Sequence, residues 1–166
     1  MAEEGADIGI NDIEQDESAL DTMRMVRDHG RTVSWHEADI SDSTNVNRML
    51  EEFIDHHGRI DILVNNAVSS IKAPFLEIKE EDWDFEVGNA LKGYFLCSQL
   101  AATMMVNQGT GGRIISISSV HAYRAFPDDT VYGVCKAALI RMAKSMAVDL
   151  AGQGITSNCI APGYID

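Results

Sequence analysis

Two residues on one predicted helix, Tyr132 and Lys136, could together carry out proton transfer. Their i, i+4 spacing places them on the same helical face, one turn apart. An ammonium beside a phenol favours the phenolate and so makes the tyrosine a more usable general acid or base. The same spacing also arises by chance on solvated helix faces, so the surrounding elements must decide between the two interpretations.

Polar residues follow two predicted buried strands. Residues 112–119 are rich in β-branched residues and end in Ser119, and residues 61–67 contain Asn65. The carboxyl end of a strand is where open α/β sheets bind ligands, so the Ser119 hydroxyl could donate to a substrate oxygen. Asparagine is a poor residue for a helix interior, which indicates a special role for Asn89.

Strands and helices alternate along the chain. We expect strands at residues 6–11, 32–38, 60–65, 113–118 and 156–160, and helices near 16–29, 43–57, 80–106 and 131–151. Helix 43–57 has a clean apolar stripe and a stop at Gly58. Apolar strands that alternate with helices predict an α/β fold with a doubly wound parallel sheet of the Rossmann type. By its length of 166 residues the chain is one domain.

Composition narrows the class of partner. The chain has 26 acidic and 13 basic residues, a formal net charge of −13, which argues against nucleic acid and anionic membranes. The uncharged run 93–112 reads as a buried interface helix and its loop, not as a membrane span. The first residues lack the basic start and apolar stretch of a signal peptide, so we expect a cytoplasmic protein.

Cysteine and histidine usage predicts no metal site. Cys97, Cys135 and Cys159 are scattered and odd in number, which favours a reducing compartment and reduced, mostly buried thiols. His56 and His57 end a predicted helix, where a role at the helix dipole is favoured over metal binding.

Several motifs occur in a fixed order along the sequence. They are Asp12, Asp39-Ile40, Asn65-Asn66-Ala67, Asn89, Ser119, Tyr132 with Lys136, and Pro162-Gly163. In this order and spacing they resemble the short-chain dehydrogenase/reductase family, of the kind that includes 3-oxoacyl-carrier-protein reductases and bacterial glucose 1-dehydrogenases. The resemblance covers essentially the whole chain. One position departs: Val68 stands where the family has glycine, and a β-branched residue does not easily adopt positive φ.

The resemblance implies an oxidoreductase that transfers a hydride between NAD and a secondary alcohol or ketone. Tyr132 would be the general acid/base, and Lys136 would lower its pKa and hold the nicotinamide ribose. Ser119 would polarise the substrate oxygen, and Asn89 would support a water relay to Lys136. Ser119, Tyr132 and His121 would border a sugar, polyol or 3-oxoacyl substrate.

The same resemblance assigns the cofactor contacts and the assembly. Asp12 would accept hydrogen bonds from the adenine ribose and so favour NAD over NADP. The other implied cofactor-binding residues are Asp39, Ile40, Asn65, Ala67, Tyr132, Lys136, Pro162 and Gly163. Two long helices, near 80–106 and 131–151, would pack in a homo-oligomer, a dimer or a tetramer.

Family likeness also predicts elements that the sequence does not contain. A first strand with a glycine-rich turn would precede residues 1–6, which read as the end of the following helix, and a substrate segment would follow Pro162. In the order 3-2-1-4-5-6 that first strand is central, so we expect unpaired edges, weak dinucleotide binding and aggregation of the chain alone. The alternative function is a catalytically inactive fragment or pseudo-enzyme subunit that retains the oligomerisation helices.

Overall fold

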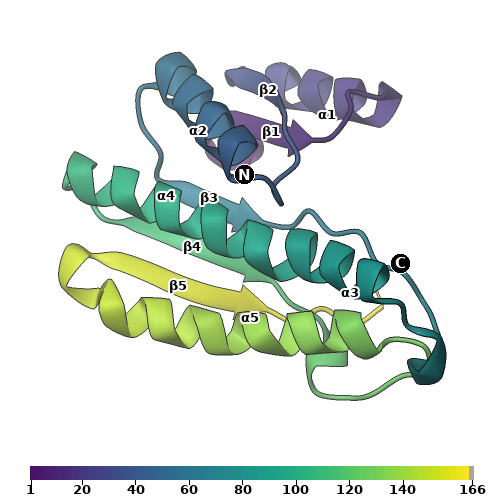
Figure 1. Ribbon diagram of the computed structural model, residues 1–166. Coiled ribbons are helices and arrows are strands. Elements are labelled where there is room, and N and C mark those ends of the chain that lie inside the picture. The colour runs from purple at the N-terminus through teal and green to yellow at the C-terminus, as the bar shows by residue number, and fades with distance from the viewer. Residues whose placement is uncertain (165–166) are drawn as a thin grey trace. The chain divides into compact units, whose positions relative to one another are not determined.

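The computed structural model describes residues 1–164 and divides into two compact units, an N-terminal unit, Met1–Arg59, and a C-terminal unit that begins at Ile60 (Figure 1). Both units are parallel β-sheets with flanking helices, as the sequence predicts. Among the described residues, the sheet of the N-terminal unit has two strands and that of the C-terminal unit has three.

The N-terminal unit is a β-α-β-α segment. After a 3-10 turn at Ala2–Glu4, its elements are β1 (Ile8–Asp12), α1 (Glu17–Asp28), β2 (Val33–Glu37) and α2 (Ser43–His57). β1 and β2 pair in parallel, with Ile8 opposite Val33. The sequence predicts that residues 1–6 are the end of a helix, and in the structure residues Ala2–Glu4 form a single 3-10 turn.

Both helices of this unit begin at an aspartate. Asp16 accepts a hydrogen bond from the Ala19 amide at 2.8 Å, and Asp42 accepts one from the Asn45 amide at 2.9 Å. α2 ends at Gly58, whose φ of 77° is the left-handed conformation that glycine adopts without strain. The predicted bounds of α2 are confirmed because both of its ends carry local signals.

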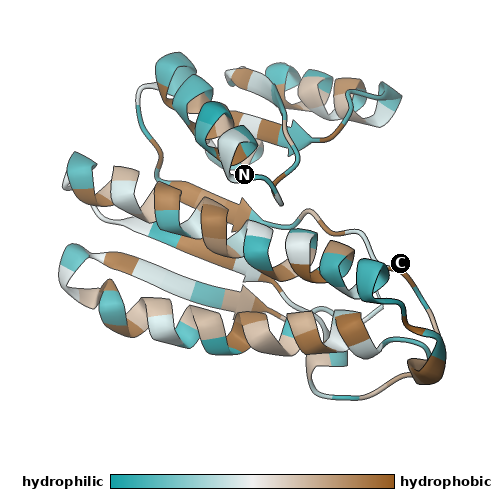
Figure 2. Cartoon of the chain, viewed as in Figure 1, coloured by the Kyte–Doolittle hydropathy of each residue, from teal (hydrophilic) through white to brown (hydrophobic). Residues whose placement is uncertain are grey.

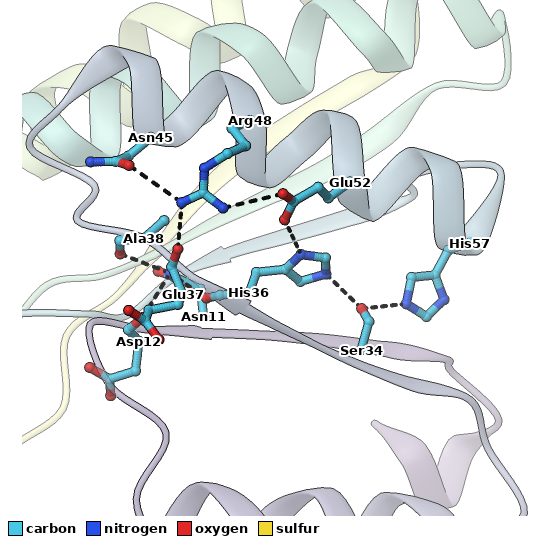
Figure 3. A network of polar contacts seen from close by, with 10 residues as sticks. All are labelled: Asn11, Asp12, Ser34, His36, Glu37, Ala38, Asn45, Arg48, Glu52 and His57. Carbon is cyan, nitrogen blue, oxygen red and sulfur yellow. Dashed lines mark hydrogen bonds and ion pairs between the residues drawn. The ribbon is translucent and has the colours of Figure 1, made fainter.

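A polar network lies between β2 and α2, with Ser34 and His36 as its buried members (Figure 3). The Ser34 hydroxyl lies 2.6 Å from Nε2 of His36 and 2.8 Å from Nε2 of His57. Glu52 of α2 lies 3.7 Å from the other ring nitrogen of His36. The ring of Phe53 lies against that of His57, with the centroids 4.6 Å apart and the ring planes tilted by 31°. His57 lies in the last turn of α2, where a role at the helix dipole was predicted, and it also makes a part-buried hydrogen bond with β2.

The C-terminal unit has a three-stranded parallel sheet in the order β3-β4-β5 within the described chain. The strands are β3 (Ile62–Asn65), β4 (Gly112–Ile117) and β5 (Ile155–Ile160). This order, and the separate pairing of β1 with β2, agree with the predicted strand order once its first strand is left out.

The helices that flank this sheet are α3 (Glu80–Val87), α4 (Gly93–Gln108) and α5 (Thr130–Asp149). Short helical turns lie at Phe75–Glu77, Val120–Ala122 and Ala151–Gln153. α4 packs on β3 and β4, and α5 packs on β5. The fully buried side chains between helices and sheet include Tyr94, Ala101, Met105, Ile114 and Leu139. No helix in residues 1–164 is long and apolar enough to cross a membrane.

The predicted helix 80–106 is interrupted in the structure. Gly88–Lys92 forms a π-helical turn between α3 and α4, and Asn89 lies in it. The Asn89 side chain donates to the Phe85 carbonyl at 2.8 Å and accepts from the Ser69 amide at 3.1 Å. Asparagine side chains compete for backbone hydrogen bonds in this way. The special role predicted from the poor helix propensity of Asn89 therefore corresponds to its hydrogen bonds in the π-helical turn.

Strand β3 differs from its prediction as a buried strand. Ile62 and Val64 are 41% and 39% exposed, on one face of the strand, whereas Asn65 is buried. Figure 2 shows that β3 is hydrophobic along most of its length. Among the described strands, β3 pairs only with β4 and so lies at the edge of its sheet. Its apolar sequence alone therefore does not ensure that its side chains are buried.

Candidate active site

The carboxyl ends of the parallel strands of the C-terminal unit gather the predicted site residues of that unit. Ser119 follows β4 and Pro162 follows β5. The Val120 amide donates to the Pro162 carbonyl at 3.0 Å, and the Ser118 amide donates to the Ile160 carbonyl at 2.7 Å. These bonds join the two strand ends into one polar edge, where open α/β sheets bind ligands.

Ser119 begins the 3-10 turn Val120–Ala122. Its hydroxyl oxygen accepts a hydrogen bond from the His121 amide at 3.2 Å, which fixes the turn that carries His121. The side chain of Ser119 is 8% exposed. A strand-end cap is therefore one observed role of this serine, and its hydroxyl hydrogen can still be donated to another group.

His121 lies against Tyr132. The two rings meet edge to face, with their centroids 5.4 Å apart, and Phe126 stacks on the imidazole with its centroid at 4.1 Å. Nδ1 of His121 is paired with the carboxylate of Asp129, which is only 7% exposed. Because a carboxylate accepts a proton-bearing nitrogen, Asp129 fixes which ring nitrogen of His121 faces other partners.

Lys136 is buried one turn after Tyr132 on α5. It is 1% exposed, and its ammonium donates to the Ile117 carbonyl at 2.7 Å. The ammonium lies 5.4 Å from the centroid of the Tyr132 ring. Burial lowers the pKa of Lys136 from its ordinary 10.5 to about 8. The predicted neighbourhood of cation and phenol is thus observed.

Hydrogen bonds inside the unit hold these groups in place. The Ser118 hydroxyl donates to the Lys136 carbonyl at 2.8 Å and so ties the end of β4 to α5. Asn65 is buried, and its amide lies 2.9 Å from the Ser98 hydroxyl and 3.4 Å from the Ser116 hydroxyl. Asn65 therefore joins β3 to α4 and β4. The sequence predicted Asn65 beside the cofactor but did not predict these contacts.

The remaining predicted residues of this unit lie near the same strand ends. Ala67 and Val68 are exposed after β3. Among residues 1–164, Asp128 is the non-glycine residue with positive φ, so Val68 fits its loop without that conformation. Gly163 is exposed beyond β5, and a Cβ added at this position would lie 3.9 Å from the Val120 side chain. Asn89 belongs to the π-helical turn already described.

In the N-terminal unit, the predicted adenosine contacts lie at the carboxyl ends of its two strands. Asp12 is exposed at the end of β1, and its carboxylate accepts from the Ile13 amide at 2.7 Å. Asp39 is exposed after β2 and accepts from the Ser41 amide at 2.8 Å. Ile40 is 8% exposed and packs in the core of this unit. Both carboxylates keep an oxygen for another donor.

Sequence reasoning missed two residues of this site. Asp129 looks like a helix cap before α5, yet it makes no capping bond and instead pairs with His121. Tyr94 of α4 is fully buried, with the Lys136 ammonium 5.3 Å from its ring centroid. The aspartate could have been found from its closeness to His121 in sequence, whereas nothing local marks Tyr94.

Comparison with known proteins agrees with this geometry. A protein-family model described as Enoyl-(Acyl carrier protein) reductase matches residues 1–166. The chain is 42% identical over 165 residues to an uncharacterized oxidoreductase, YohF, of Escherichia coli (strain K12), covering 99% of this chain and 65% of the relative.

Two solved structures are similar in fold and in sequence. The acetoin dehydrogenase from Enterobacter cloacae superposes with a TM-score of 0.93 at 41% identity, over 99% of this chain and 66% of that one. The gluconate 5-dehydrogenase from Burkholderia cenocepacia J2315, solved in complex with NADP and tartrate, superposes with a TM-score of 0.90 at 36% identity, over 99% and 64%. The chain thus spans about two thirds of the length of these relatives. By the match of its whole length to the family model, by these likenesses and by its Ser119, Tyr132 and Lys136, the chain belongs to the short-chain dehydrogenase/reductase family.

Proposed function

We propose that this chain carries the proton-transfer site of an NAD(P)-dependent oxidoreductase that interconverts a secondary alcohol and a ketone. The observation that carries the proposal is the assembly of Ser119, His121, Tyr132 and Lys136 at the carboxyl ends of β4 and β5. Nothing favours the inactive alternative, because these side chains are all present and held together by hydrogen bonds and ring contacts.

Each residue has a role that its position supports. In ketone reduction Tyr132 gives its hydroxyl proton to the substrate oxygen, and Ser119 donates a hydrogen bond to the same atom. The Lys136 ammonium stabilises the phenolate that remains, since an opposite charge nearby favours the ionised form. When bound, a nicotinamide cofactor supplies the hydride that reaches the carbonyl carbon.

The donor groups present fit a dinucleotide with free ribose hydroxyls. Lys136 is a buried cation without a carboxylate within ion-pair distance in residues 1–164, and Asp12 is an exposed carboxylate at a strand end. Lys136 would hold the nicotinamide ribose, and Asp12 would accept from the adenine ribose. Asn65, Ala67, Pro162 and Gly163 would line the remaining cofactor path.

The substrate that this site favours carries a hydroxyl near the reacting carbon. His121 lies beside Tyr132, and Asp129 holds its Nδ1, so its Nε2 can meet a substrate hydroxyl. The two dehydrogenase structures described above are named for acetoin and gluconate, whereas a relative 34% identical over 165 residues is a 3-oxoacyl-[acyl-carrier-protein] reductase of Staphylococcus aureus (strain Mu50 / ATCC 700699). The comparisons therefore favour neither class of substrate, and it is the position of His121 that supports a sugar, polyol or hydroxyketone over a 3-oxoacyl substrate.

The decisive test is Tyr132→Phe in the active enzyme. We expect turnover to fall by about 10²–10⁴-fold with cofactor affinity nearly unchanged, because only the proton donor is removed. Tyr123→Phe, at an exposed tyrosine of the same unit, is the matched control and should be neutral. Near-normal turnover of Tyr132→Phe would show the acid/base assignment to be wrong.

We further propose a preference for NAD over NADP. A 2′-phosphate would place a negative charge against Asp12 and remove a hydroxyl that this carboxylate can accept from. The similar gluconate 5-dehydrogenase was solved with NADP, so the comparison itself favours neither cofactor. The ratio of kcat/KM for the two cofactors tests the preference, and Asp12→Asn should move it toward NADP.

We also propose a cytoplasmic homo-oligomer that uses the outer face of α4 and α5. A groove of about 410 Å³ runs between these helices, lined by residues that include Phe95, Ala102, Val106, Met142 and Met146. Phe95 is 45% exposed and Val106 is 38% exposed. Light scattering of Val106→Glu, compared with the parent, should show a smaller assembly if this face packs against a second copy.

A further inference from the structure

Tyr94 is the largest fully buried side chain of the C-terminal unit, and its hydroxyl oxygen has no hydrogen-bond partner among residues 1–164. An unpartnered buried hydroxyl is unfavourable. Burial also raises the pKa of this phenol, so it stays neutral. A stabilising role for Tyr94 therefore has to come from its ring.

The face of that ring meets the Lys136 ammonium. Nζ lies 5.3 Å from the Tyr94 centroid and 5.4 Å from the Tyr132 centroid, so it lies within cation–π distance of both aromatic rings. The ammonium also donates a hydrogen bond to the Ile117 carbonyl. A buried cation with so few polar partners depends on whatever else stabilises its charge.

The other groups around the ammonium cannot neutralise it. Cys135 on the same helix and Cys159 on β5 influence it electrostatically, but burial raises the pKa of both thiols, so they remain uncharged. No carboxylate of the described chain pairs with Lys136. Besides the Ile117 carbonyl, the two ring faces are thus the negative electrostatic surface that contacts the ammonium.

We propose that Tyr94 is a positioning residue of this site, whose ring face holds the Lys136 ammonium beside Tyr132. The inference rests on the proposed function for its catalytic consequence, but not for the contact itself. It predicts that the ring of Tyr94 matters and that its hydroxyl does not.

The contact is tested by titrating Lys136 in the full chain, through the ¹³Cε resonance of its side chain, with Lys136→Met to assign the signal. We expect a midpoint near 8 in the parent chain and nearly the same midpoint in Tyr94→Phe. In Tyr94→Leu the ring is lost, so the charged form is less stable and the midpoint should fall by about one pH unit. An unchanged midpoint in Tyr94→Leu would overturn the proposal.

A second variant keeps the test decisive if Tyr94→Leu does not fold. Pentafluorophenylalanine at position 94 keeps the shape of the ring and removes its negative face. The Lys136 midpoint should again fall relative to Tyr94→Phe, and equal midpoints in these two chains would contradict the cation–π contact. Tyr123→Leu, at the exposed tyrosine, is the control and should leave the midpoint in place.

Turnover separates this inference from the proposed function. In an active enzyme, Tyr94→Leu should lower kcat at neutral pH by about 10-fold and change its pH profile, whereas Tyr94→Phe should change neither. If Tyr132→Phe retained turnover while the Lys136 midpoints moved as expected, the proposed function would fail and the contact would stand. If turnover fell in Tyr132→Phe but no Lys136 midpoint moved, the proposed function would stand and the cation–π contact would fail.

Discussion

Both units of this chain bury basic side chains, and they do so by different means. In the N-terminal unit, His36 and His57 share the Ser34 hydroxyl (Figure 3). In the C-terminal unit, Lys136 lies among aromatic rings and a backbone carbonyl. An imidazole can lose its proton near neutral pH and be buried as a neutral group, whereas an ammonium keeps its charge over most of that range.

The hydrogen-bonding capacity of the histidine network supports this distinction. The Ser34 hydroxyl has one hydrogen, so it can donate to one imidazole and accept from the other. Burial is the largest cause of the lowered pKa of both His36 and His57. Both hydrogen bonds of the Ser34 hydroxyl are satisfied when both rings are neutral. The N-terminal unit is therefore the one whose interior responds to mild acid.

The largest effect we predict is Gly111→Ala, which would break the C-terminal unit. Gly111 has a φ of 71°, and an added Cβ would lie 2.5 Å from the Gly154 carbonyl oxygen, a backbone atom that cannot move aside. We expect a loss of about 2–4 kcal/mol in the free energy of unfolding, measured by urea denaturation.

Gly109→Ala is the matched control for that substitution. Gly109 has a nearly equal φ of 70°, and nothing lies within 4 Å of an added Cβ. It should cost only about 1 kcal/mol, the strain of the left-handed conformation alone. Equal losses in the two variants would mean that the clash with Gly154 contributes nothing.

The next effect is Ser34→Ala in the N-terminal unit. Removing the hydroxyl leaves ring nitrogens of His36 and His57 without their partner, which should cost about 1–3 kcal/mol. Protection of β2 amides from hydrogen exchange should fall, and protection of β4 amides should not. Thr44→Ala, at an exposed position in the first turn of α2, is the control and should be neutral.

The smallest effect, and the sharpest comparison, is the response to pH. A histidine with a lowered pKa contributes stability that is complete above its ordinary pKa of 6.5 and is lost as the pH falls through the lower folded value. The matching loss for Lys136 is already complete below about pH 8. Between pH 7 and pH 5 we therefore expect β2 amides to lose protection while β4 amides keep theirs.

Charged neighbours modify this response without changing its sign. Glu52 favours the charged form of His36, whereas Arg48 and His56 oppose it, and Asp7 favours the charged form of His57. In the C-terminal unit, burial raises the pKa of Glu86, whose contribution is present at low pH and is lost as the pH rises. A greater loss of protection in β4 than in β2 on acidification would contradict the comparison.

The sequence predicted those features that depend on local or periodic signals. The bounds of α2 follow from Asp42, the apolar stripe and Gly58, and the parallel strands follow from apolar runs between helices. The neighbourhood of Tyr132 and Lys136 follows from helical spacing alone. Each of these signals is contained within a single element or its two ends.

The contacts that escaped prediction join elements far apart in the sequence. Tyr94 and Lys136 come from α4 and α5, and Ser34 and His57 come from β2 and α2. No spacing rule relates such pairs, because their meeting depends on how helices pack on the sheet. Asn89 shows an intermediate case: its poor helix propensity marked the place of the π-helical turn but not its form.

That π-helical turn, Gly88–Lys92, has a consequence for the faces of the two helices that it joins. A π turn accommodates one residue more than an α turn, so it acts as a single-residue insertion inside a continuous helix. Glu86 and Tyr94 are eight residues apart, and a regular α-helix, at about 100° per residue, would place their side chains about 80° apart around the axis. The residue absorbed by the π turn reduces this angle to about 20°, and both side chains are fully buried. The π turn therefore gives α3 and α4 one common buried face.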